Sequence, residues 1–192
     1  MFACCGNNPV LYCDPTGEFL GEAIKEIKSR IINLFKTIQW YFGEFSNDEK
    51  VLIATIAAEG TVTAENKPVS PTARQAMANV ALNRVGKREW AQYKSVSEIC
   101  RYSGFDGYNT YNYFACMEYL NNRDFLNATY EAIIWDVARA YLYDVTGGCQ
   151  LYYTPAVMTP PGSSPSWNFS VLTEVTISGV DPYYEGRFYK YS

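Results

Sequence analysis

Histidine is absent from the 192 residues of this chain. Its absence excludes catalysis by a serine–histidine or cysteine–histidine pair, and it excludes zinc sites that use imidazole ligands. Acid–base and nucleophilic chemistry is therefore left to carboxylates, tyrosine, lysine, serine and cysteine. The sequence also lacks a dense run of basic residues, and its formal net charge is −4. Nucleic-acid binding, which usually needs a basic stripe, is not expected.

Long apolar segments are lacking as well, because no stretch of about 18 uncharged apolar residues occurs. We therefore expect no membrane insertion. The first residues lack the basic region and apolar core of a signal peptide, so a target outside the cytoplasm would require delivery by another component. Hydrophobic residues make up 48% of the chain and charged residues 19%, which is typical of a globular domain with a good core.

Six cysteines are present without any CxxC pair, at positions Cys4, Cys5, Cys13, Cys100, Cys116 and Cys149. An even number is compatible with disulfides, and it is equally compatible with buried free thiols. The spacing of the first three corresponds to no known set of metal ligands. The sequence therefore predicts no metal site and leaves the pairing of the cysteines open.

Apolar residues at steps of three and four, together with capping signals, predict helices over residues 20–42, 48–59, 71–85, 96–102, 111–122 and 125–143. The last of these is apolar on nearly every side, so we expect it to be central and to end at the glycines of Thr146-Gly-Gly148. Short strands are predicted over residues 150–153, 171–178 and 187–191. The expected fold class is α+β, mainly helical, with a small β element near the C-terminus.

Glu59 closes a tightly apolar helix, and a loop containing glycine, asparagine and two prolines follows it. Removal from water disfavours the charged form of a carboxylate, so its pKa rises and it can hold a proton near neutral pH. A carboxylic acid of this kind can protonate the leaving oxygen of a glycosidic bond. The local sequence by itself favours a simpler interpretation, in which Glu59 ends the helix and points into water. The motifs around it reverse this preference.

Two stretches of the sequence are similar to known families. The first, Cys5-Gly-Asn-Asn-Pro-Val-Leu-Tyr-Cys-Asp-Pro-Thr-Gly17, resembles the end of the Rhs-repeat-associated core. In Rhs and related polymorphic toxins this string closes a large β-shell, and a variable C-terminal effector begins after it. The resemblance implies that the chain is, or descends from, the effector tip of such a toxin, a class that usually travels with a cognate immunity protein.

The second stretch, about residues 48–191, resembles the cell-wall hydrolase family of the spore-cortex-lytic type. An apolar helix that ends in an Ala-Glu element is present as Ile56-Ala-Ala-Glu59-Gly60. A helix of the form AxANVxLNRV follows as Ala76-Met-Ala-Asn-Val-Ala-Leu-Asn-Arg-Val85. Later family elements are matched by Thr146-Gly-Gly-Cys-Gln-Leu-Tyr-Tyr-Thr-Pro155 and by the final pair Phe188-Tyr189. The order and spacing of these pieces together carry the resemblance.

This second resemblance implies a lysozyme-like, lytic-transglycosylase domain that cleaves the β-1,4 bond between N-acetylmuramic acid and N-acetylglucosamine in peptidoglycan, with no cofactor. Glu59 then acts as general acid and afterwards as general base. A second carboxylate is not required if the sugar's own 6-hydroxyl attacks, and Asp106 and Glu65 are the candidates if one is used. The implied substrate-binding residues are Phe105, Asp106, Tyr152, Tyr153 and Trp167. Ordinary core packing is the equally weighted alternative for each aromatic one.

The resemblances also imply bracing residues, a place of action and a domain organisation. Asn79, Asn83 and Arg84 match the family's helix motif, and we expect them to brace the helices, since buried polar side chains usually satisfy backbone groups. The implied place of action is the cell wall or periplasm of a target bacterium. The implied domains are a remnant of the Rhs core (1–18), a linker or packing helix (19–45) and a catalytic domain (46–192).

Two other classes of function stay open on the sequence. A non-catalytic glycan- or protein-binding module derived from the same fold predicts that Glu59 points into solvent, away from any groove. An ADP-ribosyltransferase, which also works through glutamate and tyrosine, predicts a sheet-rich fold with an arginine or histidine on an early strand. The helix-rich pattern speaks against the second of these.

Overall fold

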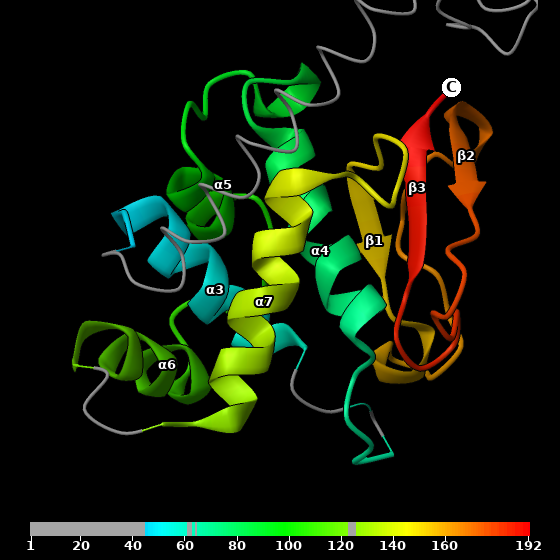
Figure 1. Cartoon of the computed structure of the whole chain (residues 1–192). Helices are drawn as coiled ribbons and strands as arrows, with labels where there is room; N and C mark the ends of the chain where they lie inside the picture. The colour runs from blue at the N-terminus through cyan, green and yellow to red at the C-terminus, as the bar shows by residue number, and fades with distance from the viewer. Residues whose placement is uncertain (1–44, 61–62, 64, 123–125) are drawn as a thin grey trace, which may run out of the picture. The chain divides into compact units, whose positions relative to one another are not determined.

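The computed structural model describes residues 45–60, 63, 65–122 and 126–192, which belong to one compact unit. This part of the chain is α+β and about half helical, as predicted, with five α-helices and one three-stranded sheet. The predicted helix over 20–42 and the Rhs-like segment lie outside the described residues. The helices are α3 (Asn47–Glu59), α4 (Pro71–Arg84), α5 (Val96–Tyr102), α6 (Tyr111–Asn122) and α7 (Ala128–Leu142) (Figure 1).

Helix α3 is the central helix and contacts α4, α5, α6 and α7. A capping box begins it: the N–H of Glu49 donates to Ser46 Oγ, and the N–H of Ser46 donates to the carboxylate of Glu49 at 2.7 Å. Every residue from Val51 to Ala57 is buried. The last residue of such a helix emerges at the edge of the core, and this is where the chain places Glu59.

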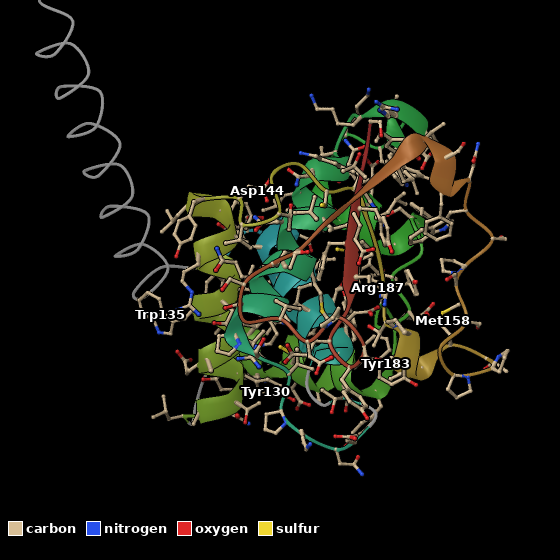
Figure 2. All side chains as sticks on the ribbon, turned by 90° about the vertical axis from the view of Figure 1, so that its right-hand side faces the viewer. Tyr130, Trp135, Asp144, Met158, Tyr183 and Arg187 are labelled. Carbon is tan, nitrogen blue, oxygen red and sulfur yellow. The ribbon has the colours of Figure 1, made fainter. Side chains whose placement is uncertain are left out.

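The prediction that the helix before the glycines is central was wrong, because α7 is amphipathic. Ile133 and Val137 are buried, whereas Ala128 and Ala132 are exposed. Figure 2 shows Trp135 on the side of α7 away from the sheet. Alanine counts as apolar in the sequence pattern but is small enough to be left in water, so the pattern overstated the burial of this helix.

Helix α7 ends at Leu142, within one residue of the predicted end, but no glycine caps it. The next residue, Tyr143, already has an extended backbone. Asn79 of α4 satisfies the helix end, because its Nδ2 donates to the carbonyl oxygen of Ala140 at 2.9 Å and its Oδ1 accepts from the N–H of Val145 at 3.1 Å. The bracing role expected for Asn79 is therefore confirmed, and a side chain from a neighbouring helix replaces the glycine cap.

Three short antiparallel strands form a second layer beside the helices, in the order β1–β3–β2, with α4 contacting β1 (Figure 1). The register places Tyr152 opposite Phe188 and Leu151 opposite Tyr189. Because successive side chains of a strand point to opposite faces, Tyr152 and Tyr153 serve different faces of the sheet. The strands are β1 (Leu151–Tyr153), β2 (Leu172–Val175) and β3 (Arg187–Tyr191).

Candidate active site

The carboxyl group of Glu59 accepts two hydrogen bonds from distant parts of the chain. The N–H of Gly107 donates to Oε1 at 2.5 Å, and the hydroxyl of Tyr152 donates to Oε2 at 3.0 Å. The side chain is half-buried. Glu59 therefore does not point freely into water, because the loop after α5 and strand β1 hold its two oxygens in place.

Burial raises the pKa of Glu59 above its ordinary value of 4.5. Loss of hydration is the largest cause, and the hydrogen bonds from Gly107 and Tyr152, which favour the charged form, oppose it without cancelling it. The nearby negative charge of Asp106 raises the pKa further, whereas the backbone N–H of the same residue lowers it. The carboxyl group therefore keeps its proton to a higher pH than an exposed glutamate does, which is the property that a general acid needs.

Gly107 packs directly against the end of α3. A β-carbon at this position would lie 2.9 Å from Cβ of Ala58 and 2.9 Å from Cγ of Glu59, which is closer than real β-carbons approach other atoms. Only glycine lets this backbone N–H reach the carboxylate. The sequence analysis did not single out Gly107, and its position next to the candidate residue Asp106 was the only signal that could have found it.

Aromatic rings hold Tyr152 from two directions. The ring of Phe188 stacks on it with 5.7 Å between centroids, and the ring of Phe105 packs against it at 5.9 Å in a tilted arrangement. Phe105 is itself only 5% exposed. The two phenylalanines thus fix the phenol so that its hydroxyl reaches Glu59.

Arg84 ties the loop after α5 to strand β1. Its guanidinium donates to the carbonyl oxygens of Ser103 and Gln150, each at 2.6 Å. It also lies over the rings of Trp90 and Phe105, at 4.8 and 5.0 Å from their centroids. Arg84 therefore braces the two segments that supply the partners of the candidate acid, as the sequence predicts for a buried arginine in this helix.

Asn83 braces the turn between α7 and β1. Its Nδ2 donates to Oδ2 of Asp144 at 3.0 Å and to the carbonyl oxygen of Cys149 at 3.1 Å. Asp144, labelled at this turn in Figure 2, also accepts from the N–H of Thr146 at 2.8 Å. These contacts hold the start of β1 against α4.

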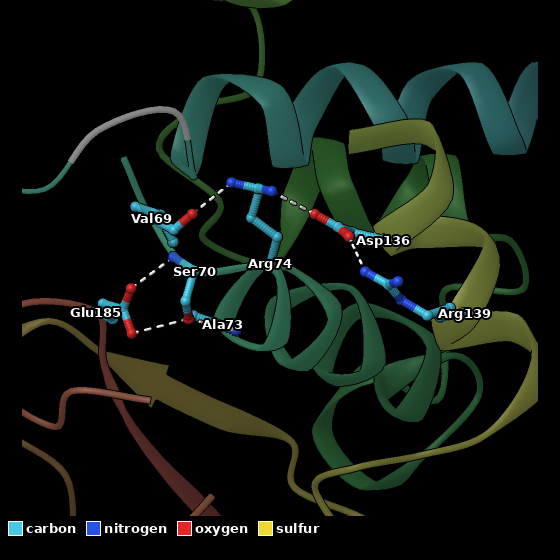
Figure 3. A network of polar contacts seen from close by, with 7 residues as sticks. All are labelled: Val69, Ser70, Ala73, Arg74, Asp136, Arg139 and Glu185. Carbon is cyan, nitrogen blue, oxygen red and sulfur yellow. Dashed lines mark hydrogen bonds and ion pairs between the residues drawn. The ribbon is translucent and has the colours of Figure 1, made fainter. Parts of the chain in front are cut away.

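A buried ion-pair network fixes the end of α3 from another side (Figure 3). Asp136 of α7 accepts from Nε of Arg74 at 2.6 Å and also pairs with Arg139. The side chains of Asp136 and Arg74 are only 3% and 10% exposed. The stem of Arg74 packs on Gly60, where a β-carbon would lie 2.9 Å from Cγ of the arginine. The residue directly after Glu59 is thus held against this network, which the sequence analysis did not predict.

Glu185, in the connection between β2 and β3, secures the start of α4 (Figure 3). Its carboxylate accepts from the N–H of Ser70 at 2.5 Å and from the hydroxyl of Ser70 at 2.9 Å. It accepts as well from the N–H of Asp181 at 2.9 Å. The C-terminal sheet is therefore joined to the helix that carries Arg74.

The two candidate second carboxylates lie in different surroundings. Asp106 is exposed and close enough to Glu59 for its charge to raise the pKa of Glu59. Glu65 is also exposed, and Lys67 pairs with it at 2.6 Å and holds its pKa below the ordinary value. Of the two, Asp106 is the carboxylate that the structure places beside Glu59.

Tyr153 and Trp167 form a separate aromatic cluster on the other face of β1. Tyr153 stacks on Tyr189 with 6.0 Å between centroids and meets Trp167 edge-on at 5.6 Å. The alternation of the strand is the reason, because a ring at Tyr152 that faces Glu59 sends the next side chain to the opposite face. Of the five predicted substrate-binding residues, the structure thus brings three to Glu59 and places these two elsewhere.

The cysteines in the described part of the chain, Cys100, Cys116 and Cys149, are buried free thiols. Burial raises the pKa of Cys100 and of Cys116 to about 12 and that of Cys149 to about 11. Thiols that stay protonated near neutral pH are poor nucleophiles. Across the described residues, no group of three or more acidic or cysteine side chains could hold a metal ion.

Comparisons with models of protein families, with curated proteins and with solved structures found no match to this chain. The resemblance to the wall hydrolases therefore rests on the sequence motifs, and the candidate site rests on its own geometry. In the part of the chain that the structure describes, no helix combines the length and apolar character that a bilayer span requires.

Proposed function

We propose that this chain cleaves the glycan strands of peptidoglycan as a lytic transglycosylase with a lysozyme-like catalytic domain, and that Glu59 is its general acid and base. The observation that carries the proposal is the half-buried carboxyl group of Glu59, which has a raised pKa and is held by Gly107 and Tyr152. The wall-hydrolase motifs, which include both Glu59 and Tyr152, support the same reaction.

In the proposed reaction, protonated Glu59 gives its proton to the glycosidic oxygen while the bond between that oxygen and C1 of N-acetylmuramic acid breaks. Positive charge develops at C1 and the ring oxygen. The carboxylate then accepts the proton of the sugar's own 6-hydroxyl as that oxygen attacks C1. The product is a 1,6-anhydro sugar, and Glu59 returns to its acid form without a second carboxylate or a water molecule.

The two hydrogen bonds to Glu59 give its two carboxyl oxygens different roles. The N–H of Gly107 can only donate, so Oε1 is best kept as an acceptor and the transferable proton belongs on Oε2. The hydroxyl of Tyr152 can accept when Oε2 is protonated and donate when it is ionised. Burial favours the acid at the start of the cycle, and the same two partners stabilise the carboxylate in the middle of it.

A hydrolase is the second candidate, and the position of Asp106 favours it. In that reaction Asp106 would activate a water molecule for attack on C1 or stabilise the positive charge at C1. Water, rather than the sugar's 6-hydroxyl, would then be consumed. The charge of Asp106 is close enough to raise the pKa of Glu59. The identity of the product separates the two reactions.

The rival functions are less well supported by the geometry. A binding module predicts that Glu59 points into solvent, whereas its carboxyl group is half-buried and accepts two hydrogen bonds. An ADP-ribosyltransferase predicts a sheet-rich fold, whereas the first strand in the described part of the chain follows five helices.

The test of the proposal is digestion of purified peptidoglycan by the wild-type protein and by Glu59→Gln, with the products identified by mass spectrometry. Gln keeps the size of the side chain and an acceptor for the N–H of Gly107, but it has no carboxylic acid proton to transfer to the glycosidic oxygen. We expect anhydro-muropeptides from the wild type and a rate at least about 10²-fold lower from the variant. Glu118→Gln, at an exposed position of α6, is the matched control and should leave the rate unchanged.

Other outcomes would redirect the proposal in defined ways. Reducing-end products would replace the transglycosylase by the hydrolase and direct the next variant to Asp106. Equal rates for the wild type and Glu59→Gln would remove Glu59 as the acid. A folded wild-type protein that gives no products would favour the binding module.

The segment Cys5–Gly17 supports the further proposal that the chain is an antibacterial effector with a cognate immunity protein. Peptidoglycan lies outside the cytoplasmic membrane, so toxicity should depend on export. We expect a bacterium to lyse when it expresses the chain behind an added signal peptide and to survive when the same chain stays in the cytoplasm. Killing from the cytoplasm that persists in Glu59→Gln would contradict a wall target.

A further inference from the structure

A cavity of about 440 Å³ lies where α3, α5 and α6 meet, away from the hydrogen bonds of Glu59. The rings of Tyr102, Tyr108 and Tyr113 line it. Tyr113 is only 5% exposed and packs against Tyr108 with 4.9 Å between centroids, so this part of the wall is fixed. Tyr102 is 58% exposed and forms the outer rim. Aromatic faces of this kind bind cations and flat apolar groups of a ligand.

Arg101 brings a positive charge into this cavity. Its Nε donates to the hydroxyl of Tyr108 at 2.9 Å, and its guanidinium lies 5.7 Å from the ring centroids of both Tyr102 and Tyr108. None of the ion pairs between described residues involves Arg101. The two tyrosines orient the guanidinium, and most of its five N–H groups are left for a ligand carboxylate.

Glu98 brings a negative charge to the same cavity, one turn before Arg101 on α5. Although residues three apart on a helix can pair, Glu98 turns back to cap the helix, and its Oε2 accepts from the N–H of Lys94 at 2.7 Å and of Ser95 at 3.2 Å. Its other oxygen accepts no hydrogen bond within the described part of the chain. The cavity thus presents separate positive and negative groups, which suit a ligand with both a carboxylate and an ammonium group.

The cavity lies within reach of the candidate active site along two routes. Tyr108 directly follows Gly107, whose N–H binds Glu59. Val51, which also lines the cavity, precedes Glu59 by eight residues of α3, or roughly 12 Å along the helix axis. A peptide of four residues in extended form spans about 13–14 Å. A short peptide attached to a sugar at Glu59 can therefore place its end in the cavity.

We propose that this cavity binds the stem peptide of peptidoglycan, with a peptide carboxylate on Arg101 and the side-chain ammonium group of a diamino acid on Glu98 and the tyrosine faces. The inference rests on the function proposed for Glu59, because the stem peptide belongs to the same substrate as the glycan strand that Glu59 would cleave. It makes the protein selective for glycan strands that still carry their peptides.

The first experiment measures binding without any sugar, so that it does not depend on cleavage. The probe is the synthetic tripeptide N-acetyl-L-alanyl-γ-D-glutamyl-meso-diaminopimelate, whose acetyl group replaces the amide link to the sugar. It is titrated calorimetrically into the wild type and into Arg101→Gln. We expect the variant to bind about tenfold more weakly, since a charge-assisted hydrogen bond to the carboxylate is lost. Arg88→Gln removes an arginine that also lies over a tyrosine, at 4.2 Å from the ring of Tyr191, and should bind like the wild type.

A second variant tests the negative group separately. Glu98→Gln keeps the capping box, in which glutamine serves as well as glutamate, so the fold is preserved. We expect it to bind the tripeptide several-fold more weakly than the wild type does. Acetylation of the side-chain amino group of the diaminopimelate should remove this difference, because that ammonium group is the partner of Glu98.

A third measurement compares intact glycan strands with strands stripped of their peptides by an amidase. We expect the wild type to show a lower KM on intact strands and Arg101→Gln to show a smaller difference between the two KM values, with an unchanged kcat on stripped strands. The inference is overturned if the wild type does not bind the tripeptide, or if Arg101→Gln and Arg88→Gln bind it equally, even while glycan cleavage proceeds. Arg101-dependent binding without any glycan cleavage would instead overturn the function proposed for Glu59 and keep the peptide site.

Discussion

The backbone N–H of Gly107 donates to Oε1 of Glu59 at 2.5 Å, across 48 positions of the sequence. This contact exists because the loop after α5 passes so close to α3 that its residue has no room for a β-carbon. It fixes one oxygen of the carboxyl group and leaves the other, Oε2, to Tyr152 and to the substrate. The geometry of the proposed acid therefore depends on a residue that takes no part in proton transfer.

Gly107→Ala should lower kcat/KM by about tenfold or more, because the new β-carbon would push the loop away from Glu59. The cost in stability should be roughly 1–3 kcal/mol, typical of overpacking. Gly86→Ala is the control, since it adds strain at a φ of +67° in open space. Kinetics and thermal unfolding of both variants check the prediction. A Gly107→Ala protein that loses no more activity than Gly86→Ala would show that the contact is dispensable.

Tyr152→Phe should move the alkaline limb of the pH–rate profile to higher pH. The hydroxyl of Tyr152 favours the charged form of Glu59, so its removal raises the pKa of that carboxyl further. The rate at the optimum should fall by about tenfold, as an orienting hydrogen bond to a charged group is lost. Phe fits between Phe105 and Phe188 without loss of packing.

Tyr153→Phe is the matched control for this pH profile. Its hydroxyl lies 3.2 Å from Oγ of Ser164, on the other face of the strand. We expect its pH profile of kcat/KM to coincide with that of the wild type. A profile that shifts equally in both variants would point to the strand as a whole rather than to the hydroxyl of Tyr152.

Glu59→Gln should stabilise the protein at neutral and alkaline pH. Because the pKa of Glu59 is raised in the folded state, its contribution to stability is fully present below pH 4.5 and is lost as the pH rises through the folded-state pKa. Gln carries no charge at any pH and escapes this loss. The difference in Tm between variant and wild type should therefore grow from acid to alkaline pH, as measured by thermal unfolding across a pH series. A difference that stays constant with pH would mean that Glu59 ionises without cost.

Asp136→Asn should destabilise the fold by about 2–4 kcal/mol, because it leaves the buried guanidinium of Arg74 without its negative partner. Thermal unfolding should show a fall in Tm of roughly 5–15 °C. Activity should fall as well, since Arg74 packs on the residue that follows Glu59. Glu65→Gln breaks the exposed pair with Lys67 and should leave Tm unchanged. Similar Tm values for the two variants would refute a supporting role for the buried network.

The helices of the described part were predictable because their signals are local. Ser46 and Glu49 form the capping box that their spacing predicts, and Ser70 with Pro71 begins α4 as expected. The burial of α7 was misjudged because a count of apolar residues does not show which side a neighbouring helix covers. The glycine cap predicted for its end was wrong because Asn79, from another helix, satisfies that end.

The candidate site was only partly predictable. Glu59 stood out through its position at the end of an apolar helix and through the motif around it, and Tyr152 through the segment that resembles the family. Gly107 and Arg74 gave no such signal, since a glycine in a loop and an arginine in a helix are ordinary until their neighbours are known. Tyr153 looked equivalent to Tyr152 in the sequence, and the strand separates them.

The sequence by itself determined which chemistry was available, because it holds no histidine, and it determined that a carboxylate would end a helix of apolar residues. Only the tertiary structure decided the hydrogen-bond partners and the pKa of that carboxylate. Its hydrogen-bond partners lie 48 and 93 positions away along the chain, and desolvation, the largest cause of its raised pKa, comes from all the elements packed around it. Hydration and hydrogen bonding act through space over a few ångströms, so no local pattern of residues fixes them.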